Sequence, residues 1–303
     1  MERVHRRLND GGLFGRGWAP YWQVAPLALV FVVFFVLPLV ATAVVSVWRY
    51  NEYSMIPALV GDNYAAVFSG CLDELPKLCV TLKTYLSTLK FCVLTWLLTL
   101  GLGFTLAYFL AFHVRSLSWQ MTLFLVCTIP FWTSNVIRMI SWVPLLGRNG
   151  LVNGTLQAAG LTRGPLDWLL FSDFAVVLAF VHLYTMFMIV PIFNSMSRID
   201  RALIEAARDA GASGRQTLWN IIVPLSKPGI VIGSIFVITL VMGDYVTIGV
   251  MGGQQIASVG KIIQVQLSYL QFPLAAANAV VLLAAVLLVV AGMTRMVDIR
   301  KEL

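Results

Sequence analysis

The 303-residue chain is 59% hydrophobic and only 12% charged, with a mean hydropathy of +0.85. Since a water-soluble domain carries about 25% charged residues, these values exclude a soluble protein and indicate one that crosses a membrane several times. The formal net charge of +7 does not indicate nucleic-acid binding, because the basic cytoplasmic loops of a membrane protein produce the same excess.

The chain begins with a polar, basic stretch over residues 1–23, which contains Arg3, Arg6, Arg7 and Arg16 and which we expect to be a cytoplasmic tail. Six apolar stretches follow, each long enough to cross about 30 Å of hydrocarbon. We expect these spans at roughly 24–47, 86–112, 119–140, 174–196, 229–250 and 274–297. Together they form one transmembrane domain over residues 24–297, and a cytoplasmic tail over 298–303 follows it.

Three of the spans carry local features. Ala41-Thr42-Ala43 in the first span is similar to a signal-peptidase site, but the apolar run is longer than a signal peptide needs, so we expect an uncleaved span. Pro130 lies inside the third span and should kink it. Gly101 and Gly103 in the second span would allow close contact between helices.

The distribution of lysine and arginine predicts the orientation of the chain. With the N-terminus inside, thirteen of the 21 basic residues lie on the cytoplasmic side and the remaining eight lie on the other side. We therefore expect both termini, and the polar stretch between spans four and five, in the cytoplasm.

Cysteines give no sign of a metal site. Cys71 and Cys79 share the first outer loop, where an oxidising compartment could join them in a disulfide, and two free or buried thiols are an equal alternative. Cys92 and Cys127 lie in spans and suit packing. No second cysteine or histidine pair lies nearby, so a zinc site is not expected.

Residues 199–224 form the longest polar, helix-forming segment of the chain. The pattern predicts two short helices joined by a turn. The signals that begin and end these helices are Asp200 as an N-cap, Gly211 as a left-handed C′ residue, a Ser213–Gln216 capping box, and Pro224 as the end of the second helix.

One face of the first of these helices consists mainly of methyl groups. It contains Leu203, Ala206, Ala207 and Ala210, which recur with helical spacing. A capped, rigid helix pair with small side chains on one face indicates an element that docks into another protein. The alternative for Glu205, beside that face, is a solvated residue paired with Arg201 or Arg208.

Catalytic motifs are missing from the sequence. Gly260-Lys261 is followed by Ile262 and lacks the upstream glycine of a phosphate-binding G-x-x-x-x-G-K-[ST] loop, so the chain should not hydrolyse ATP by itself. G-x-S-x-G and H-E-x-x-H are also missing. We expect no covalent chemistry and no cofactor in this chain.

A solute pathway is suggested by Asp244, the only acidic residue inside an expected span, and by the adjacent Tyr245. A cationic solute would be bound by a carboxylate and by aromatic faces. The residues that could supply those faces are Trp132, Trp142 and Tyr184. Interfacial tryptophans, and a structural cap or ion pair at Asp244, are the alternatives. Arg138 fits an anchor or a gate, and it would disfavour a polycation.

A known family matches these residues. Glu205-Ala206-Ala207, Gly211 and Ile221-Ile222-Val223-Pro224 resemble the EAA motif, E-A-A-x-x-x-G followed by I-x-L-P, of the permease subunits of binding-protein-dependent ABC importers. Val223 replaces the usual leucine.

A second set of segments resembles the spermidine/putrescine permease branch of that family, over roughly residues 84–297. The segments are Pro130–Ser134, Arg138, Trp142, Leu145–Gly147, Asn149–Asn153, Gly243–Thr247 and Gly252-Gly253. The sequence departs from that branch at Met251, where leucine is usual, and at Ser141, where an aromatic residue is frequent.

The resemblance implies an all-α type I ABC importer permease fold with six transmembrane helices and a cytoplasmic coupling-helix pair. It implies that Glu205, Ala206, Ala207, Gly211 and Pro224 couple the chain to an ATPase subunit. The implied partners are a second permease, two ATPase subunits that bind ATP and Mg²⁺, a periplasmic solute-binding protein and the lipid of a bacterial inner membrane.

The solute implied by the resemblance is a polyamine. Alternatives within the same importer class are a phosphonate, an opine-like compound, thiamine and ferric iron. Outside that class, an ion-coupled secondary transporter would show two similar halves with broken helices, and no clear internal repeat is present. A membrane sensor or channel subunit with no transport cycle is a further alternative.

Overall fold

The computed structural model describes residues 19–51, 54–69, 71 and 79–295. The expected tail residues 1–18 and 298–303, with Arg3, Arg6, Arg7 and Arg16, lie outside this part of the chain. Four helices in the described part are long and apolar enough to cross a membrane, and the count reaches six when each of two bent helix pairs is taken as one span. The expected six-span, all-helical fold is thus confirmed.

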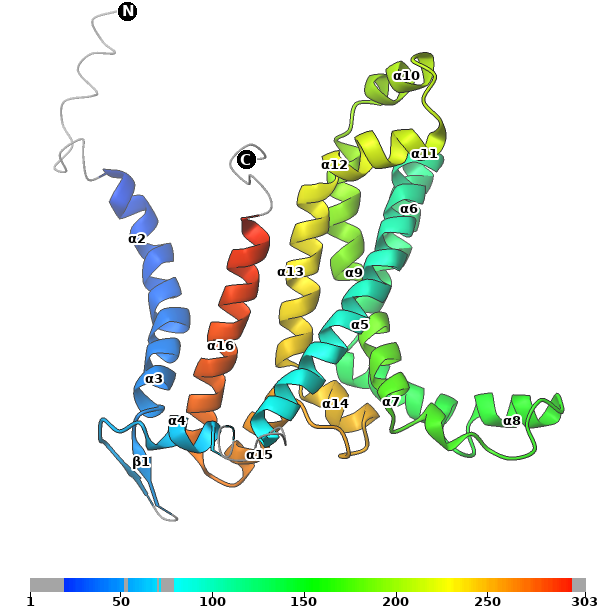
Figure 1. The fold of residues 1–303 in the computed structure, drawn as a ribbon. Coiled ribbons are helices and arrows are strands. Elements are labelled where there is room, and N and C mark those ends of the chain that lie inside the picture. The colour runs from blue at the N-terminus through cyan, green and yellow to red at the C-terminus, as the bar shows by residue number, and fades with distance from the viewer. Residues whose placement is uncertain (1–18, 52–53, 70, 72–78, 296–303) are drawn as a thin grey trace, which may run out of the picture.

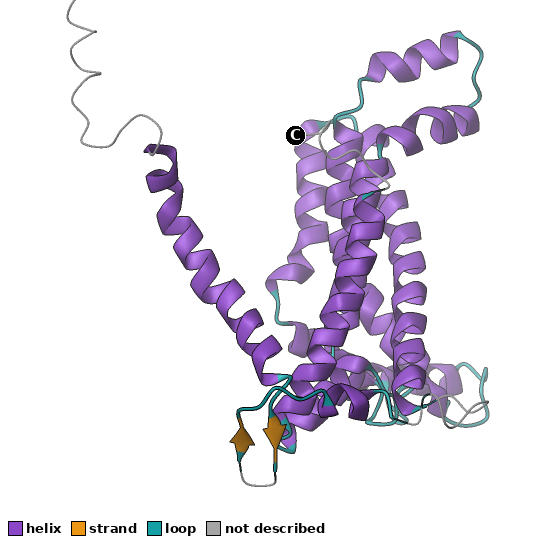
Figure 2. Cartoon of the chain, turned by 60° about the vertical axis from the view of Figure 1, so that its left-hand side comes forward, coloured by secondary structure: helices purple, strands orange, loops and turns teal. Residues whose placement is uncertain are grey.

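The first span diverges from the other helices toward its N-terminal end (Figures 1 and 2). It consists of α2 (Ala19–Phe31), a π-helical turn η1 (Val32–Val36) and α3 (Leu37–Val45). The apolar stretch Tyr21–Val45 has 25 residues and a mean hydropathy of 2.9. Its most apolar 18-residue segment contains no buried residue. Such a surface is stable only against lipid or another apolar protein surface.

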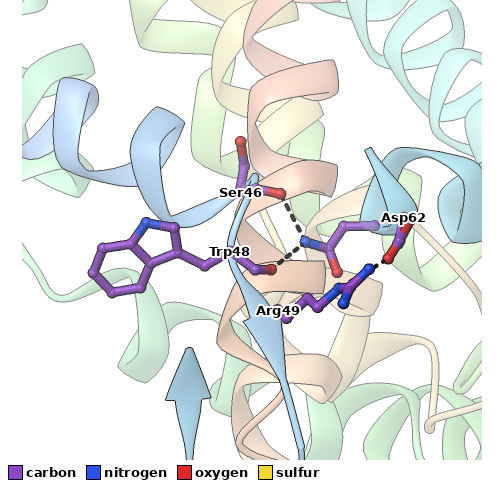
Figure 3. A network of polar contacts seen from close by, with 5 residues as sticks. Ser46, Trp48, Arg49 and Asp62 are labelled. Carbon is purple, nitrogen blue, oxygen red and sulfur yellow. Dashed lines mark hydrogen bonds and ion pairs between the residues drawn. The ribbon is translucent and has the colours of Figure 1, made fainter. Parts of the chain in front are cut away.

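Polar contacts stabilise the C-terminal end of the first span (Figure 3). Two short antiparallel strands, β1 (Arg49–Tyr50) and β2 (Met55–Ile56), and the short helix α4 (Asp62–Val67) follow it. The buried Asn63 amide donates to the carbonyl oxygens of Ser46 and Trp48, both at 2.8 Å. Arg49 pairs with Asp62 at 3.4 Å. The two Asn63 bonds satisfy carbonyl groups at and just beyond the end of α3, where no intrahelical partner is available.

Three helices form the centre of the bundle: α5 (Val80–Tyr108), continued by η2 (Phe109–His113), α9 (Asp173–Ser197) and α13 (Lys227–Gly243). Gly103 of α5 and Gly233 of α13 both face Met188 of α9, where an added Cβ would lie 2.8 Å from the methionine side chain. Glycine therefore allows these helices to approach closely. The last helix, α16 (Phe272–Thr294), packs against α13 and against α3 of the first span.

The expected third span, 119–140, is wrong beyond Trp132. The crossing helix is α6 (Leu117–Thr128) with the 3₁₀ turn η3 (Ile129–Trp132), and the chain then bends by 88° into α7 (Asn135–Leu146) and α8 (Leu151–Ala158). Pro130 sits in the 3₁₀ turn, and Thr133 is extended at φ −96° and ψ 150°. Apolar residues continue on both sides of the short polar segment Thr133–Asn135, so a hydropathy average did not reveal the break.

The expected fifth span is also too long. Helix α13 ends at Gly243, Asp244 is extended at φ −78° and ψ 114°, and a separate helix, α14 (Val246–Met251), follows. The physical reason is that the Asp244 carboxylate accepts the Thr247 backbone N–H and so begins a new helix. Asp244 is therefore not inside a continuous span.

The bundle has two different ends (Figure 1). We call one the hairpin end: it holds β1, β2, α4, α7, α8, α14, the short turn η4 (Asp167–Leu169) and α15 (Val259–Ser268). The opposite end, the α10 end, holds α10 (Arg201–Asp209), α11 (Gly214–Thr217), η5 (Leu218–Ile222) and α12 (Val223–Leu225). The start of α2 and the end of α16 also lie on the side of the α10 end.

Candidate functional site

Helix α10 has the local structure that its sequence predicts. The Asp200 carboxylate accepts the backbone N–H of Ala202 at 2.9 Å, which caps the helix. At the other end, Gly211 has φ +83°, and the Ala212 N–H donates to the Ala207 carbonyl at 2.9 Å. This left-handed turn leads the chain into the second helix.

The second helix begins at the predicted capping box. The Ser213 N–H donates to Gln216 Oε1 at 2.8 Å, and the Gln216 N–H donates to Ser213 Oγ at 3.3 Å. The prediction that Pro224 ends this helix is wrong, because the helix continues to Leu225. The π-helical turn η5 precedes Pro224, so the ring enters a turn whose hydrogen bonds are already displaced.

After Leu225 the chain bends by 64° into α13. Ser226 lies at the bend, fully buried, and both its N–H and its hydroxyl donate to the Ile222 carbonyl, at 2.9 and 2.6 Å. Only Ser226 separates the two helices, so α12 and α13 are joined without a loop.

The predicted methyl face of α10 lies on the protein surface. Leu203, Ala206 and Ala210 are exposed, whereas Ile204 is buried and anchors α10 on the bundle core. Glu205 is exposed and forms no ion pair within the described residues, so the pairing with Arg201 or Arg208 is not observed. The surface formed by these residues is therefore uncovered in the single chain.

A second candidate site is a polar cluster at the hairpin end. The Tyr184 hydroxyl and the Thr247 hydroxyl both donate to Asp244 Oδ2, each at 2.6 Å, and the Thr247 N–H donates to Asp244 Oδ1 at 2.9 Å. Tyr184 and Thr247 are buried. The structure thus brings together two of the predicted pathway residues, Asp244 and Tyr184, and adds Thr247.

Arg138 of α7 belongs to the same region. It is only 8% exposed, donates to the Asn135 side chain, and lies within electrostatic reach of Tyr184. Its Nε has no hydrogen-bond partner among the residues that the structure describes. Among the residues that the structure describes, Arg138 is therefore a buried cation without a carboxylate in direct contact.

The three aromatic side chains predicted to face the solute differ in their surroundings. Trp142 donates from Nε1 to His182 Nδ1 at 3.0 Å and packs on that ring edge-to-face. Tyr184 stacks on Phe180 with ring centroids 5.7 Å apart. Trp132, 83% exposed at the end of η3, lies on the surface. Only Trp132 presents an open ring face in this structure.

Tyr245 lies apart from its neighbour's hydrogen-bond cluster. Its half-exposed side chain lines a shallow cavity of about 210 Å³ together with Lys261 and Gln264. Lys261 donates to Gln264 Oε1 at 3.0 Å. The cavity beside Tyr245 therefore carries a cation rather than an acid.

A larger cavity, of about 610 Å³, was missed by sequence reasoning. It lies between η3, α9 and α13, and three phenylalanines from these elements, Phe131, Phe187 and Phe236, line it. Phe187 contacts Phe131 edge-to-face at 5.6 Å and Phe236 at 6.1 Å. Asn194 and Arg198, near the end of α9, also line it, so it extends toward the α10 end. No local pattern relates these residues, because they come from three separate segments.

A disulfide and an ion pair are two further contacts at or near the hairpin end. Cys71 and Cys79 form a disulfide in the structure, while Cys92 and Cys127 are free. Lys90, which the sequence places inside the second span, pairs with Asp173 at the start of α9 at 2.6 Å. Sequence reasoning missed this ion pair because its members are separated by 83 residues.

Comparison with known proteins agrees with this architecture. Residues 22–302 match the family described as "Binding-protein-dependent transport system inner membrane component". The spermidine/putrescine transport system permease protein PotB of Escherichia coli (strain K12) is 36% identical over 138 residues, which cover 45% of this chain and 50% of that protein. The chain thus spans about half the length of the curated relatives it matches.

Two more similarities complete the comparison. The inner membrane ABC transporter permease protein YdcU of Escherichia coli (strain K12) is 32% identical over 120 residues, 36% of this chain and 38% of that protein. The crystal structure of a bacterial alginate ABC transporter, in complex with an alginate pentasaccharide-bound periplasmic protein, superposes with a TM-score of 0.73. It covers 93% of this chain and 94% of that one at 18% identity, which shows a shared fold.

Proposed function

Because the chain belongs to the family of binding-protein-dependent transport system inner membrane components, we propose that it is a permease subunit of an ATP-driven importer. The observation that carries this proposal is the uncovered methyl face of α10, which is joined through a buried bend to the transmembrane helix α13. ATP is bound and hydrolysed by a separate subunit, with Mg²⁺, and this chain supplies half of the solute path.

The α10 face is suited to bind an ATPase subunit. Methyl groups at Ala206 and Ala207 let a partner backbone approach closely, and the unpaired Glu205 carboxylate can accept from an arginine or from backbone N–H groups. The caps at Asp200 and Ser213 keep the helix pair rigid. A rigid element transmits movement of the ATPase to the spans, as a flexible loop would not.

The proposed assembly contains a second, similar permease, two ATPase subunits and a periplasmic solute-binding protein. The exposed first span and the open side of the phenylalanine cavity are apolar surfaces that a second permease or lipid would cover. Arg198, Arg201, Arg208 and Arg215 all lie at the α10 end. The positive-inside rule therefore favours a cytoplasmic α10 end, with both termini inside and the hairpin end facing the periplasm.

We propose a polyamine as the solute, on the similarity to the PotB permeases. The phenylalanine cavity agrees with a solute that has methylene chains and ammonium groups, because aromatic faces bind both. Arg198 lines the phenylalanine cavity, Lys261 lines the cavity beside Tyr245, and Arg138 is buried, so these described residues form no acidic surface that would select a polycation. Selectivity then resides in the solute-binding protein.

The proposal is tested by reconstituting all subunits in lipid vesicles and measuring uptake of radiolabelled spermidine. We expect uptake that requires ATP and the binding protein and that vanadate abolishes. Uptake that follows the membrane potential and ignores ATP would disprove the importer function. ATP-dependent uptake of a different solute would disprove only the polyamine assignment.

Docking of the ATPase is tested separately by Ala206→Trp, which places a large ring on the α10 face. We expect the ATPase subunit no longer to copurify with the permease. The matched control is Ala65→Trp, at an exposed alanine of α4 at the hairpin end, which should leave copurification unchanged. Equal copurification with both variants would refute docking on α10.

A further inference from the structure

Asp244 has almost no capacity left to bind a solute. Its two oxygens already accept hydrogen bonds from the Tyr184 hydroxyl, the Thr247 hydroxyl and the Thr247 N–H. A carboxylate offers about four lone-pair sites, so three of them are occupied. Two of these bonds are 2.6 Å long, as expected for strong O–H···O⁻ contacts.

The same bonds join separate elements. Tyr184 is on α9, Thr247 is on α14, and Asp244 is the extended residue between α13 and α14. The Tyr184–Asp244 bond connects residues 60 positions apart. Because Asp244 also caps α14, the carboxylate fixes both the angle between α13 and α14 and the contact of α14 with α9.

The half-buried Asp244 shares its partner Tyr184 with a buried cation, because both Asp244 and Arg138 lie within electrostatic reach of Tyr184. More than nine-tenths of Arg138 is buried, and its charge acts on Tyr184, which hydrogen-bonds Asp244. Arg138 comes from α7, and α14 packs against both α7 and α9. A positive side chain of α7 and a negative side chain between α13 and α14 thus both act on Tyr184 of α9.

The two ends of the solute path differ. Toward the α10 end, α9 and α13 border the phenylalanine cavity of about 610 Å³. At the hairpin end, α7, α9 and α14 meet in packed contact, and Met139, Ile248 and Met251 from α7 and α14 are buried in the core. The bundle thus has a cavity toward the α10 end and is tightly packed at the hairpin end.

We propose that Tyr184 and Asp244 are positioning residues that hold α14 against α9 and thereby close the hairpin end of the solute path. Opening of that end then breaks the Tyr184–Asp244 bond while the cap on α14 stays formed. Asp244 does not bind the solute in this role. The inference rests on the proposed function, because a closed end has meaning only in a transport cycle.

The test uses the complete transporter in lipid vesicles and measures ATP hydrolysis without the solute-binding protein. Tyr184→Phe removes only the hydroxyl and keeps the ring on Phe180. Since a hydrogen bond to a charged group contributes roughly tenfold or more to an equilibrium, we expect ATP hydrolysis without binding protein to rise several-fold. Less solute should then be taken up for each ATP hydrolysed.

The matched control is Tyr64→Phe, which removes a tyrosine hydroxyl bonded to Ser46 at 2.7 Å, also at the hairpin end but outside the cluster. It should leave ATP hydrolysis without binding protein at the wild-type level. Thr247→Val removes a hydroxyl whose bond to Asp244 is local to the start of α14, so the Tyr184–Asp244 bond remains and ATP hydrolysis without binding protein should stay near the wild-type level. In the double variant, Tyr184→Phe with Asp244→Ala, the rise should be smaller than the sum of the two single effects, because both remove one bond.

The inference is overturned if assembled Tyr184→Phe and Asp244→Ala transporters both hydrolyse ATP at the wild-type rate without binding protein. It is also overturned if Asp244→Asn changes the concentration of solute that half-saturates uptake but not this uncoupled hydrolysis, since that result identifies Asp244 as a solute ligand. Failure of the wild-type transporter to use ATP would instead refute the proposed function.

Discussion

Replacing Gly229 by alanine should separate α13 from α9. An added Cβ at Gly229 would lie 2.4 Å from the Pro191 carbonyl oxygen, 2.8 Å from Ser195 Cβ and 2.9 Å from Ile192 Cα. Two of these three atoms are backbone atoms, so no side-chain rotation can relieve the contact. Ordinary contact begins at 3.4 Å, so α13 must move by about 1 Å.

The cost follows from two effects. Forcing an extra carbon into a packed contact costs about 1–3 kcal/mol. Moving α13 also weakens the bond from the Gly229 N–H to Ser195 Oγ, which is 3.0 Å long, and such a bond contributes about 0.5–1.5 kcal/mol. Alanine is the better helix former by about 1 kcal/mol and offsets part of this cost. We expect a net loss of about 1–3 kcal/mol.

Thermal denaturation of the purified permease in detergent, followed by tryptophan fluorescence, measures this loss. A loss of 1 kcal/mol lowers the melting temperature by about 2–4 °C in a domain of moderate size, so Gly229→Ala should melt several degrees below the wild type. Gly101→Ala and Gly292→Ala are matched controls, because nothing lies within 4 Å of their added Cβ atoms. Both should melt at or slightly above the wild-type temperature.

Gly233 offers a variant in which the added Cβ meets less resistance than at Gly229. At Gly233 the nearest atom to an added Cβ is Met188 Sδ at 2.8 Å, the far end of a flexible side chain, and the nearest backbone atom is at 3.2 Å. Gly233→Ala should therefore destabilise the permease less than Gly229→Ala does. If Gly229→Ala melted as high as Gly101→Ala, the close backbone contact between α9 and α13 would be refuted.

Three further predictions concern other parts of the chain. Gly211→Ala should lower the amount of solute transported per ATP, because φ is +83° there and a side chain costs about 1–2 kcal/mol in that conformation. The control Gly214→Ala should not lower it, because nothing lies within 4 Å of the added Cβ. Equal coupling in the two variants would contradict a functional role for the left-handed turn at Gly211. Asn63→Leu leaves two carbonyl groups unpaired and should lower the melting temperature by several degrees, since each costs about 1–3 kcal/mol; an unchanged value would contradict the contacts in Figure 3. Thiol labelling of the denatured, unreduced protein should modify two of its four cysteines, and all four after reduction of the Cys71–Cys79 bond; four labelled thiols before reduction would exclude it.

The local sequence was sufficient for features that depend on neighbouring residues. The expected span at 174–196 differs by one residue at each end from α9, because the length of an apolar run is a property of composition. The caps at Asp200, Ser213 and Gly211 form as predicted, since each depends on backbone groups within a few residues. For the same reason the EAA-like motif could be recognised without a structure.

The sequence failed where apolar composition continues through a change of direction. The residues around Thr133 and Asp244 are apolar enough to extend a span, yet the chain bends by 88° after Trp132 and α13 ends at Gly243. Pro224 was expected to end a helix, but a π-helical turn before it accommodates the ring. These outcomes depend on which hydrogen bonds the folded chain can make, and a hydropathy pattern does not contain that information.

The sequence by itself determined the membrane class, the helical spans in outline and the capped helix pair at 199–224, because period, length and capping act over short distances. Only the tertiary structure decided which side chains meet. It joined Tyr184 to Asp244 across 60 positions, buried Arg138 beside them and brought Phe131, Phe187 and Phe236 around one cavity. These contacts follow from the packing of α6, α7, α9, α13 and α14, and no local sequence pattern specifies how separate helices pack.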